Sequence, residues 1–481
     1  MDDRSSASGR TGATRRTFLS ASAATAGAAA LLSTAVTAGS ASAAALPKSE
    51  ADVGLGRLIG EIDPARIEAT ITRLVQFGTR HTASSQTDPK RGIGAATTWV
   101  FDQMQAIAAT SSGRMTVERQ SFIQQAVPPS LPKATTITNV IATLKGTASP
   151  ERFYVITGHL DSRVTDVTDF TSDAPGADDD ASGVAVVLEL ARLFATRQFP
   201  GTLVFAAVDG EEQGLFGSAF MAAQMKKAGA DVQGMFSNDI VGASQAFDGT
   251  KPDPFSVRLF VEGVPAADSA AQISLIEAVG GENDGGTHQL ARFVTAVAPA
   301  SLTGMNIRVI WRRDRYLRGS DHVSFQAQGY PAARITEPRE NFNHEHRNVD
   351  VIDGVKFGDR LEFVDFRYTA RVAKVNAAAL WALATNPATP KNVQIHVTPP
   401  AGFAGINHTV LTWDANPETD LSGYEVVTRE TSSPDWTQAI PVGNVTSVTL
   451  DIAKDNLQFG VRAVDKAGHR SPVGFPATVT T

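Results

Sequence analysis

The sequence predicts an α/β domain whose mixed central sheet is flanked by helices, followed by a small all-β C-terminal sandwich. Up to about residue 385, short apolar runs alternate with helical patterns, an order typical of a sheet covered by helices on both faces. After Pro390 the segments become short, β-rich and interrupted by turns. With 481 residues, 42% of them hydrophobic, the chain is long enough to bury two such cores.

Composition excludes several classes of protein. The 43 Lys and Arg residues are outnumbered by 50 Asp and Glu residues, and the formal charge of -7 leaves no basic surface for nucleic acid. The chain has no cysteine, which excludes disulfides, iron–sulfur clusters and thiol nucleophiles. We therefore expect any metal to be held by His, Asp and Glu.

Residues 1–45 are expected to be an export signal. Arg15-Arg16 stand just before Phe18-Leu19, and the weakly apolar stretch that follows ends near Ala41-Ser42-Ala43. This arrangement resembles a twin-arginine signal peptide. It has too few large apolar residues for a membrane anchor, so we expect a secreted or periplasmic protein without a membrane span.

The second segment, residues 46–388, carries the α/β pattern. Helical spacing runs from residue 64 to about 125, where a Pro-rich link at 128–132 interrupts it. Beyond the link we expect strands at 153–156, 203–207, 257–261 and 307–311, and helices at 184–195, 216–227, 267–278 and about 359–384.

The third segment, residues 389–481, resembles a fibronectin type III sandwich. The resemblance rests on the apolar stretches at 411–414, 421–426 and 459–465, and roughly 90 residues suit seven strands. We expect this domain to attach the protein to a polymer or a cell surface, or to act as a spacer.

Four groups of polar residues follow expected strands, which is where open α/β sheets bind their ligands. In the first group, residues 158–162 read Gly-His-Leu-Asp-Ser. In an extended segment His159 and Asp161 point to the same side, so the carboxylate can accept an imidazole N–H and leave the other nitrogen for a cation. For this pair alone, a solvated loop is the alternative.

The second group is Asp178-Asp179-Asp180, ahead of the helix expected from Val184. One Asp at such a place is an ordinary N-cap. Three in succession repel one another, and a divalent cation would relieve that repulsion. An exposed acidic turn is the alternative, and the spacing does not match the alternating oxygen ligands of an EF-hand.

The third group is Glu211-Glu212, between an apolar strand and a helix. One carboxylate can bind a metal while the other takes a proton from water, although the helix dipole also favours Glu at this place. The fourth group is Asn238-Asp239, where a carboxylate again stands at a strand end.

Together the four groups resemble the zinc aminopeptidase family M28, and the resemblance covers about residues 60–385. It implies a zinc-exopeptidase-like fold with two Zn²⁺ ions. The roles it implies are His159 and Asp239 as ligands of one ion, Glu212 and a late His as ligands of the other, Asp179 as the bridge, Glu211 as general base and Asp161 as the group that orients His159.

The late His is left open between two residues. His346 has an acidic residue, Asp350, four places later, as the family ligand does, whereas His344 stands nearer to the aromatic Phe342. His322 is expected beside the site and not on the metal.

Two features near the expected site have more than one interpretation. Tyr316 is close to the place where some relatives carry a Tyr that polarises the scissile carbonyl. The arginines of residues 312–318 either pair within their own loop or reach the carbonyl or C-terminal carboxylate of a substrate.

These inferences predict a secreted dizinc exopeptidase, an aminopeptidase that hydrolyses N-terminal peptide bonds of peptide substrates through a water shared by the ions. A different reaction on the same scaffold is the alternative: a carboxypeptidase, another amide hydrolase, or a glutaminyl cyclase. The third possibility is a non-catalytic adhesion or binding protein, although the complete ligand set and the retained base argue against it.

Overall fold

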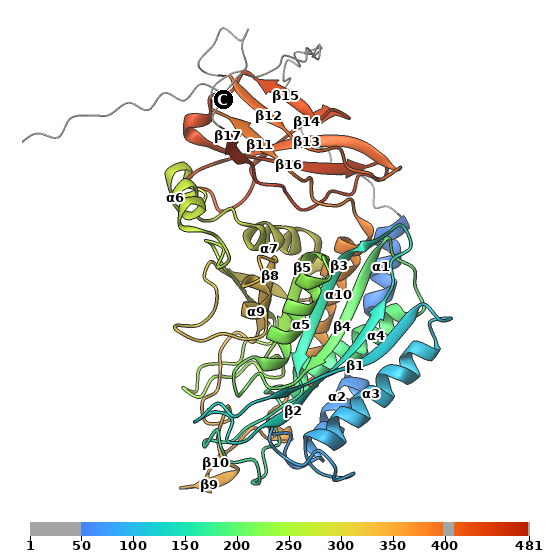
Figure 1. Cartoon of the computed structure of the whole chain (residues 1–481), viewed down its shortest axis with the longest axis vertical. Helices are drawn as coiled ribbons and strands as arrows, with labels where there is room; N and C mark the ends of the chain where they lie inside the picture. Colours follow the sequence, from blue (N-terminus) through green and yellow to red (C-terminus); the bar gives the residue numbers. More distant parts are fainter. Residues whose placement is uncertain (1–49, 398–407, 480–481) are drawn as a thin grey trace, which may run out of the picture. The chain divides into compact units, whose positions relative to one another are not determined.

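The computed structural model describes residues 50–397 and 408–479 and confirms the expected fold class (Figure 1). The expected export signal lies outside the described residues. The α/β domain is built on an eight-stranded mixed sheet with the order β1-β2-β4-β3-β5-β8-β6-β7. Its strands are β1 Met115–Gln124, β2 Thr135–Leu144, β3 Ser149–His159, β4 Gly201–Val208, β5 Asp231–Asn238, β6 Ser256–Val261, β7 Asn306–Ile310 and β8 Ala332–Thr336.

Ten α-helices are described in the same domain, several of them begun by aspartate caps. Asp63, Asp180 and Asp365 accept hydrogen bonds from the first free N–H groups of their helices, which stabilises helix starts. None of the helices in the described ranges has the length and apolar character that crossing a bilayer requires. The helices are α1 Glu50–Gly60, α2 Pro64–Val75, α3 Ile93–Ala109, α4 Ala181–Ala195, α5 Phe216–Lys227, α6 Ala270–Val279, α7 Gly286–Val297, α8 Ala300–Thr303, α9 His322–Gln326 and α10 Phe366–Thr385.

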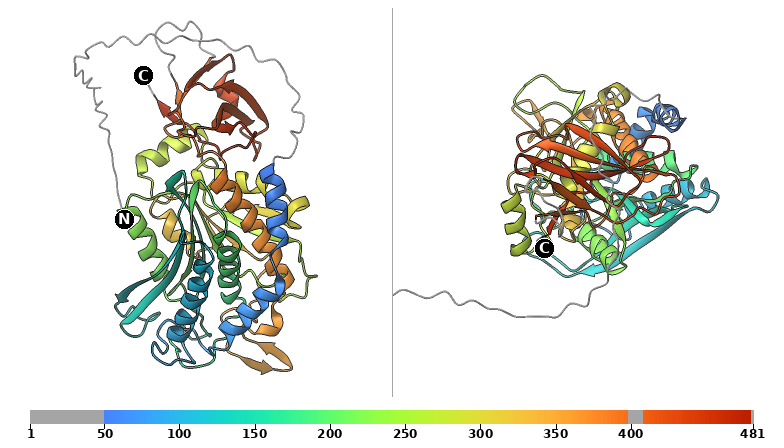
Figure 2. Two further views of the ribbon diagram at one scale, coloured as in Figure 1. Left: turned by 90° about the vertical axis from the view of Figure 1, so that its right-hand side faces the viewer. Right: turned by 90° about the horizontal axis from the view of Figure 1, so that it is seen from above.

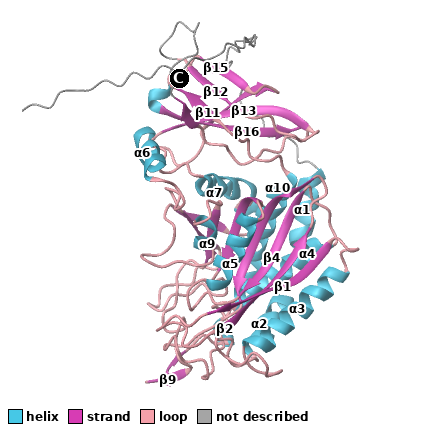
Figure 3. Ribbon diagram, in the orientation of Figure 1, coloured by secondary structure: helices cyan, strands magenta, loops and turns pink. Residues whose placement is uncertain are grey.

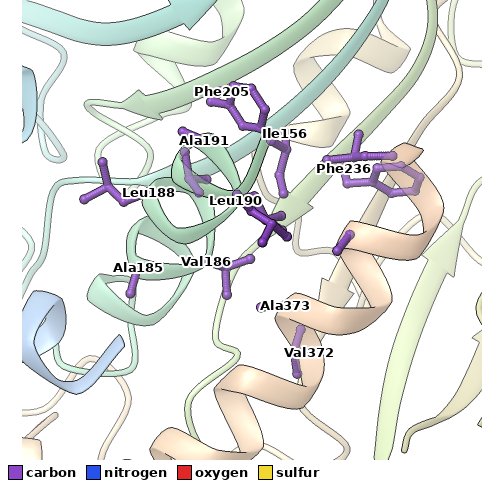
Figure 4. Packing of buried hydrophobic residues seen from close by; sticks show 14 of the residues in the cluster. Ile156, Ala185, Val186, Leu188, Leu190, Ala191, Phe205, Phe236, Val372 and Ala373 are labelled. Carbon is purple, nitrogen blue, oxygen red and sulfur yellow. The ribbon is translucent and has the colours of Figure 1, made fainter. Parts of the chain in front are cut away.

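Helices cover both faces of the sheet because successive strand residues point to opposite sides. Ile156 of β3 packs in the core formed with α2, α3, α4 and α10, whereas its neighbour Val155 packs with Met221 of α5 and Phe325 of α9. Figure 4 shows Ile156 and Phe205 beside α4. The two helical layers can be followed in Figures 2 and 3.

The order of the parallel strands places the site. Strands β4, β3, β5 and β8 are parallel neighbours, so their carboxyl ends meet at one edge. The chain passes from β3 through α4 to β4, and then through α5 to β5 on the other side of β3. Such a reversal of strand order opens a crevice beyond the strand ends.

The prediction of helix up to residue 125 is wrong after Ala109. Residues Met115–Gln124 form β1, which pairs antiparallel with β2 over ten residue pairs. The pairing partner lies beyond the Pro-rich link, so the local pattern did not reveal it. The other expected elements match to within a few residues, apart from the start of the closing helix, which is Phe366 instead of about 359.

The C-terminal residues form two antiparallel-rich sheets around a core of their own. The core includes Trp413 and Tyr424, whose ring centroids lie 5.3 Å apart. The likeness to a fibronectin type III domain stays a prediction. One sheet has the order β15-β12-β11-β17 and the other β14-β13-β16. The strands are β11 Gln394–His396, β12 Thr409–Thr412, β13 Leu421–Glu430, β14 Gln438–Gly443, β15 Ser447–Leu450, β16 Leu457–Asp465 and β17 Ala477–Val479.

A short hairpin, β9 Asp350–Ile352 and β10 Val355–Phe357, projects from the α/β domain shortly after His346. It forms a separate two-stranded sheet.

Candidate functional site

The first donor group forms where β3, α4 and β5 meet. His159 is the last residue of β3, and its Nε2 lies 2.9 Å from Asp179 Oδ1 and 3.9 Å from Asp239 Oδ1. Asp179 precedes α4, and Asp239 directly follows β5. One donor atom from each of the three buried residues lies within 4.8 Å of the others, so a single metal ion could bind all three.

The second donor group forms around His346. Its Nε2 lies 2.9 Å from Asp179 Oδ2 and 3.1 Å from Glu212 Oε2. Asp179 therefore contributes one oxygen to each histidine. The other oxygen of Glu212, Oε1, is buried and has no hydrogen-bond partner.

The structure separates the two candidates for the late histidine. The ring of His344 stacks on Phe363 with centroids 3.6 Å apart, and burial lowers its pKa to about 4. Only His346 of this pair contacts the other donor residues. His322 is fully buried, and its Nε2 is 2.9 Å from the main-chain oxygen of Arg313; its expected place beside the site stays a prediction.

Asp161 contacts the ring of His159 through its main-chain oxygen and, at a longer distance, through its carboxylate; its role in orienting the ring stays a prediction. Nδ1 of His159 is 3.1 Å from the main-chain oxygen of Asp161, while the carboxylate is 3.7 Å away. The carboxylate instead accepts hydrogen bonds from the main-chain N–H groups of Gly210, Glu211 and Glu212, at 2.9, 3.2 and 3.0 Å. Asp161 therefore joins the loop of His159 to the loop of the two glutamates.

The loop that carries Asp179 is held on both sides. Asp180 caps α4 and also accepts the N–H of His159 at 2.8 Å. Asp359 accepts the N–H groups of Asp178 and Asp179 at 2.9 and 2.7 Å. The carboxylates of Asp178 and Asp180 accept hydrogen bonds from Ser182 and Gly183, whereas that of Asp179 contacts the two histidines.

Arg80 connects the loop after His159 to the loop that carries Asp179 and was not anticipated from the sequence. Its buried guanidinium donates to the main-chain oxygens of Leu160, Pro175 and Gly176 at 2.7, 2.5 and 2.9 Å. Nothing in the short segment around Arg80 distinguishes it from a surface arginine, because its partners come from segments 80 and more residues away.

The potential in the site is strongly negative. Burial alone would lower the pKa of His159. Asp180 and the other carboxylates around the ring outweigh burial and raise this pKa well above its usual value. Burial, followed by the charges of Asp239 and Glu212, raises the pKa of Glu211 well above the usual value for glutamate. A divalent cation would be attracted to such a site.

A chain of ion pairs runs from the donor groups to the arginine-rich loop. Buried Arg334 lies 3.1 Å from Asp239 and 3.1 Å from Asp314. Asp314 also pairs with Arg315, at 2.9 Å. Arg334, at the centre of β8, was not among the residues expected near the site.

The arginines of residues 312–318 have partners within the protein. Arg313 lies 3.3 Å from Glu262, and Arg315 and Arg318 lie 3.0 and 3.2 Å from Glu340. The guanidinium of Arg312 lies over the ring of Tyr316. The side chain of Tyr316 is 83% exposed, and no contact places it on the donor residues.

Comparisons with known proteins identify the family of the chain. The profile of peptidase family M28 matches residues 139–359, the part of the chain that contains all the donor residues. A probable zinc metalloprotease of Leptosphaeria maculans is 48% identical over 419 residues, which cover 87% of this chain and 96% of that protein. The chain belongs to peptidase family M28. The resemblance inferred from its motifs is thereby confirmed at the level of the family.

One further relative and two solved structures are also similar to this chain. A probable zinc metalloprotease of Pyrenophora tritici-repentis is 45% identical, over 88% of this chain and 98% of its own length. The LapA aminopeptidase of Legionella pneumophila has a TM-score of 0.48 and 16% identity, over 72% of this chain and 78% of that chain. An aminopeptidase from Aneurinibacillus has a TM-score of 0.47 and 18% identity, over 69% and 96% of the two chains.

Proposed function

We propose that this M28 peptidase is a secreted zinc exopeptidase of the aminopeptidase type that holds two metal ions and removes residues from peptide N-termini. The observation that carries the proposal is the pair of donor groups that share Asp179, with His159 and Asp239 in one and His346 and Glu212 in the other. The names of the zinc metalloprotease relatives support the choice of metal.

The donor set fits zinc. Imidazole nitrogens and carboxylate oxygens are common zinc ligands, and the carboxylates of Asp179 and Glu212 both face the ring of His346. Glu212 Oε1 is buried without a hydrogen-bond partner, and a bound cation would supply a partner for this oxygen. When bound, two zinc ions would act as Lewis acids toward the attacking water and the scissile carbonyl.

Glu211 is the proposed general base. Its raised pKa, which comes first from burial, suits a group that takes a proton from the attacking water and passes it to the leaving amine. Glu212 faces His346, so the two adjacent glutamates have different tasks. Asp161 holds both through their main-chain N–H groups.

The charges around the site favour an aminopeptidase over a carboxypeptidase. A carboxypeptidase needs a cation for the terminal carboxylate of its substrate, but Arg315, Arg318 and Arg334 are already paired with carboxylates. An aminopeptidase needs a carboxylate for a terminal ammonium, and carboxylates are abundant here.

The test compares amino-acid anilides with the same anilides acetylated on the amino group. We expect zinc-loaded enzyme to hydrolyse only the free-amine substrates, and elemental analysis to find about two zinc ions per chain, as the donor set requires. Equal hydrolysis of both substrates, or release of residues from peptide C-termini, would refute the aminopeptidase assignment. A single bound ion would refute the two-metal assignment.

Export and surface attachment complete the proposal. The Arg15-Arg16 pair and the Ala41-Ser42-Ala43 segment support export by the twin-arginine route, to the periplasm or the medium. The separate core of the C-terminal sheets supports a module that binds a polymer or a surface. Replacing both arginines by lysine should retain the protein in the cytoplasm, and cell fractionation would show it.

A further inference from the structure

Exposed large apolar side chains concentrate in the segment that carries His346. Phe342 precedes this histidine by four residues, and further members lie in and beside the hairpin β9–β10 (Figure 1). The exposed fractions of these side chains run from 41% to 56%. Single exposed apolar residues are ordinary on a protein surface, but a concentration of them marks a surface that binds another molecule. The members on the hairpin side form what we term the apolar hairpin, Val349, Val351, Ile352 and Val355.

The apolar residues occupy both faces of the hairpin. Ile352 and Val355 are partners in the antiparallel register, so their side chains share one face. Val351 is the neighbour of Ile352 and therefore points to the opposite face. A hairpin packed against its own domain would bury one of these faces, but all three side chains are exposed.

The hairpin also has free strand edges. Among the described residues, β9 and β10 pair only with each other, so each strand keeps one edge without a partner strand. A two-stranded sheet is only marginally stable by itself. A further extended segment laid along one edge would both pair with the backbone and cover apolar side chains.

Contacts fix the hairpin to the loop that carries His346. The N–H of Gly358, directly after β10, donates to the main-chain oxygen of Asn343 at 3.1 Å. The guanidinium of Arg347 lies over the ring of Phe357, 5.1 Å from its centroid. Strand β9 begins four residues after His346, so at most about 14 Å of chain separates them. An extended peptide covers that distance with about four residues.

We propose that the apolar hairpin binds the part of a peptide substrate that follows the scissile bond, through apolar residues about three to five places beyond that bond. The proposal rests on the proposed exopeptidase function and adds a substrate class to it, oligopeptides with an apolar stretch shortly after the N-terminal residue. An extended peptide matches the hairpin because it offers backbone groups to a free edge and side chains to Ile352 and Val355.

Two other occupants fit the hairpin less well. A stable contact between two copies takes roughly 20–30 residues on each side, whereas the hairpin extends only from Asp350 to Phe357. A lipid surface favours several Lys and Arg residues beside the apolar ones. The hairpin instead carries Asp350 and Asp353 against Lys356.

The test compares two heptapeptides on full-length, zinc-loaded protein. Leu-Ala-Ala-Val-Val-Val-Lys is apolar at the third to fifth places beyond the first peptide bond, and Leu-Ala-Ala-Ser-Ser-Ser-Lys is polar there. Wild type should show a kcat/KM about 10-fold higher for the valine peptide, mainly through KM, because each of two buried apolar contacts is worth about a factor of 3–4. In Ile352→Thr/Val355→Thr this ratio should fall to about 2 or less, and threonine keeps the preference for strand.

Three controls separate peptide binding from damage to the catalytic site. Leucine anilide has no residues beyond the scissile bond, so wild type and the threonine variant should hydrolyse it equally. Ile352→Val/Val355→Ile keeps the apolar character and should keep the wild-type ratio. Leu275→Gln should also keep it, because Leu275 is 44% exposed on α6, far from the hairpin (Figure 1).

Three results would overturn the inference. One is a wild-type ratio in the threonine variant. Another is the absence of any preference in wild type that hydrolyses leucine anilide. The third is a wild-type dimer that dissociates in the threonine variant, measured by sedimentation, which would assign the hairpin to self-association. If wild type hydrolyses neither the anilide nor the peptides, the proposed function itself fails and the inference fails with it, so the two failures are distinguished.

Discussion

Replacing Asp161 with asparagine should destabilise the turn that presents Glu211 and Glu212. The buried carboxylate accepts three main-chain N–H groups, whereas an amide has one acceptor oxygen and a nitrogen that donates. At least one buried N–H is then unpaired, at a cost of about 1–3 kcal/mol, and two remaining bonds each lose about 1 kcal/mol of charge assistance. The expected loss is about 3–5 kcal/mol.

Hydrogen exchange measures this loss where it occurs. In the metal-free protein, protection of the amides of residues 210–212 should fall by roughly a hundredfold or more, since 1.4 kcal/mol corresponds to a factor of 10. Metal-free protein is used because bound metal would add its own stabilisation. If Asp161→Asn leaves this protection unchanged, the carboxylate does not hold the turn, and its assigned role is wrong.

Asp209→Asn is the matched control, because Asp209 is also buried but its pKa is shifted in the opposite direction. Burial, followed by the charge of Asp161, raises the pKa of Asp209 well above its usual value, whereas the contacts of Asp161 lower its pKa, so removing the charge should cost less at Asp209. An asparagine can accept the N–H of Thr138 and donate to the hydroxyl of Thr82, the two partners of Asp209. The control should lose less than about 1 kcal/mol.

Three further predictions concern the base, the late ligand and acid stability. Glu211→Gln should keep both metal ions but lose about 10²- to 10⁴-fold in turnover; loss of metal with normal turnover per ion would reverse the roles of the two glutamates. His346→Ala should lose bound zinc by elemental analysis, whereas His344→Ala should retain it, and the opposite result would exchange the two assignments. Burial alone would raise the pKa of Glu189, but Arg192 and Arg66 hold it below its usual value. The stabilisation is therefore present above the unfolded pKa of about 4.3 and is lost as pH falls. Wild type should lose more stability than Glu189→Gln between about pH 5 and pH 3, as measured by thermal unfolding.

Local sequence predicts most of the helices and strands, and it singles out the candidate donor residues. Apolar runs such as the one at 203–207 are buried on both faces in a parallel sheet, so they stand out as strands, and β4 is found there. The helix expected at 216–227 is α5. The polar residues that follow these strands were recognisable because the chemistry of His, Asp and Glu at strand ends does not depend on distant contacts.

Distant contacts decided the remaining features. The local pattern of residues 115–124 predicts helix, but these residues form strand β1 because they pair with β2 across a Pro-rich link. His344 and His346 are two residues apart and almost equivalent as sequence, but only one of them faces Asp179 and Glu212. The sheet order sets which loops meet, so the contacts of Asp161 could be found only from the assembled fold. Composition and pattern specify the type of each element, whereas the direction of a side chain depends on partners that are far away along the chain.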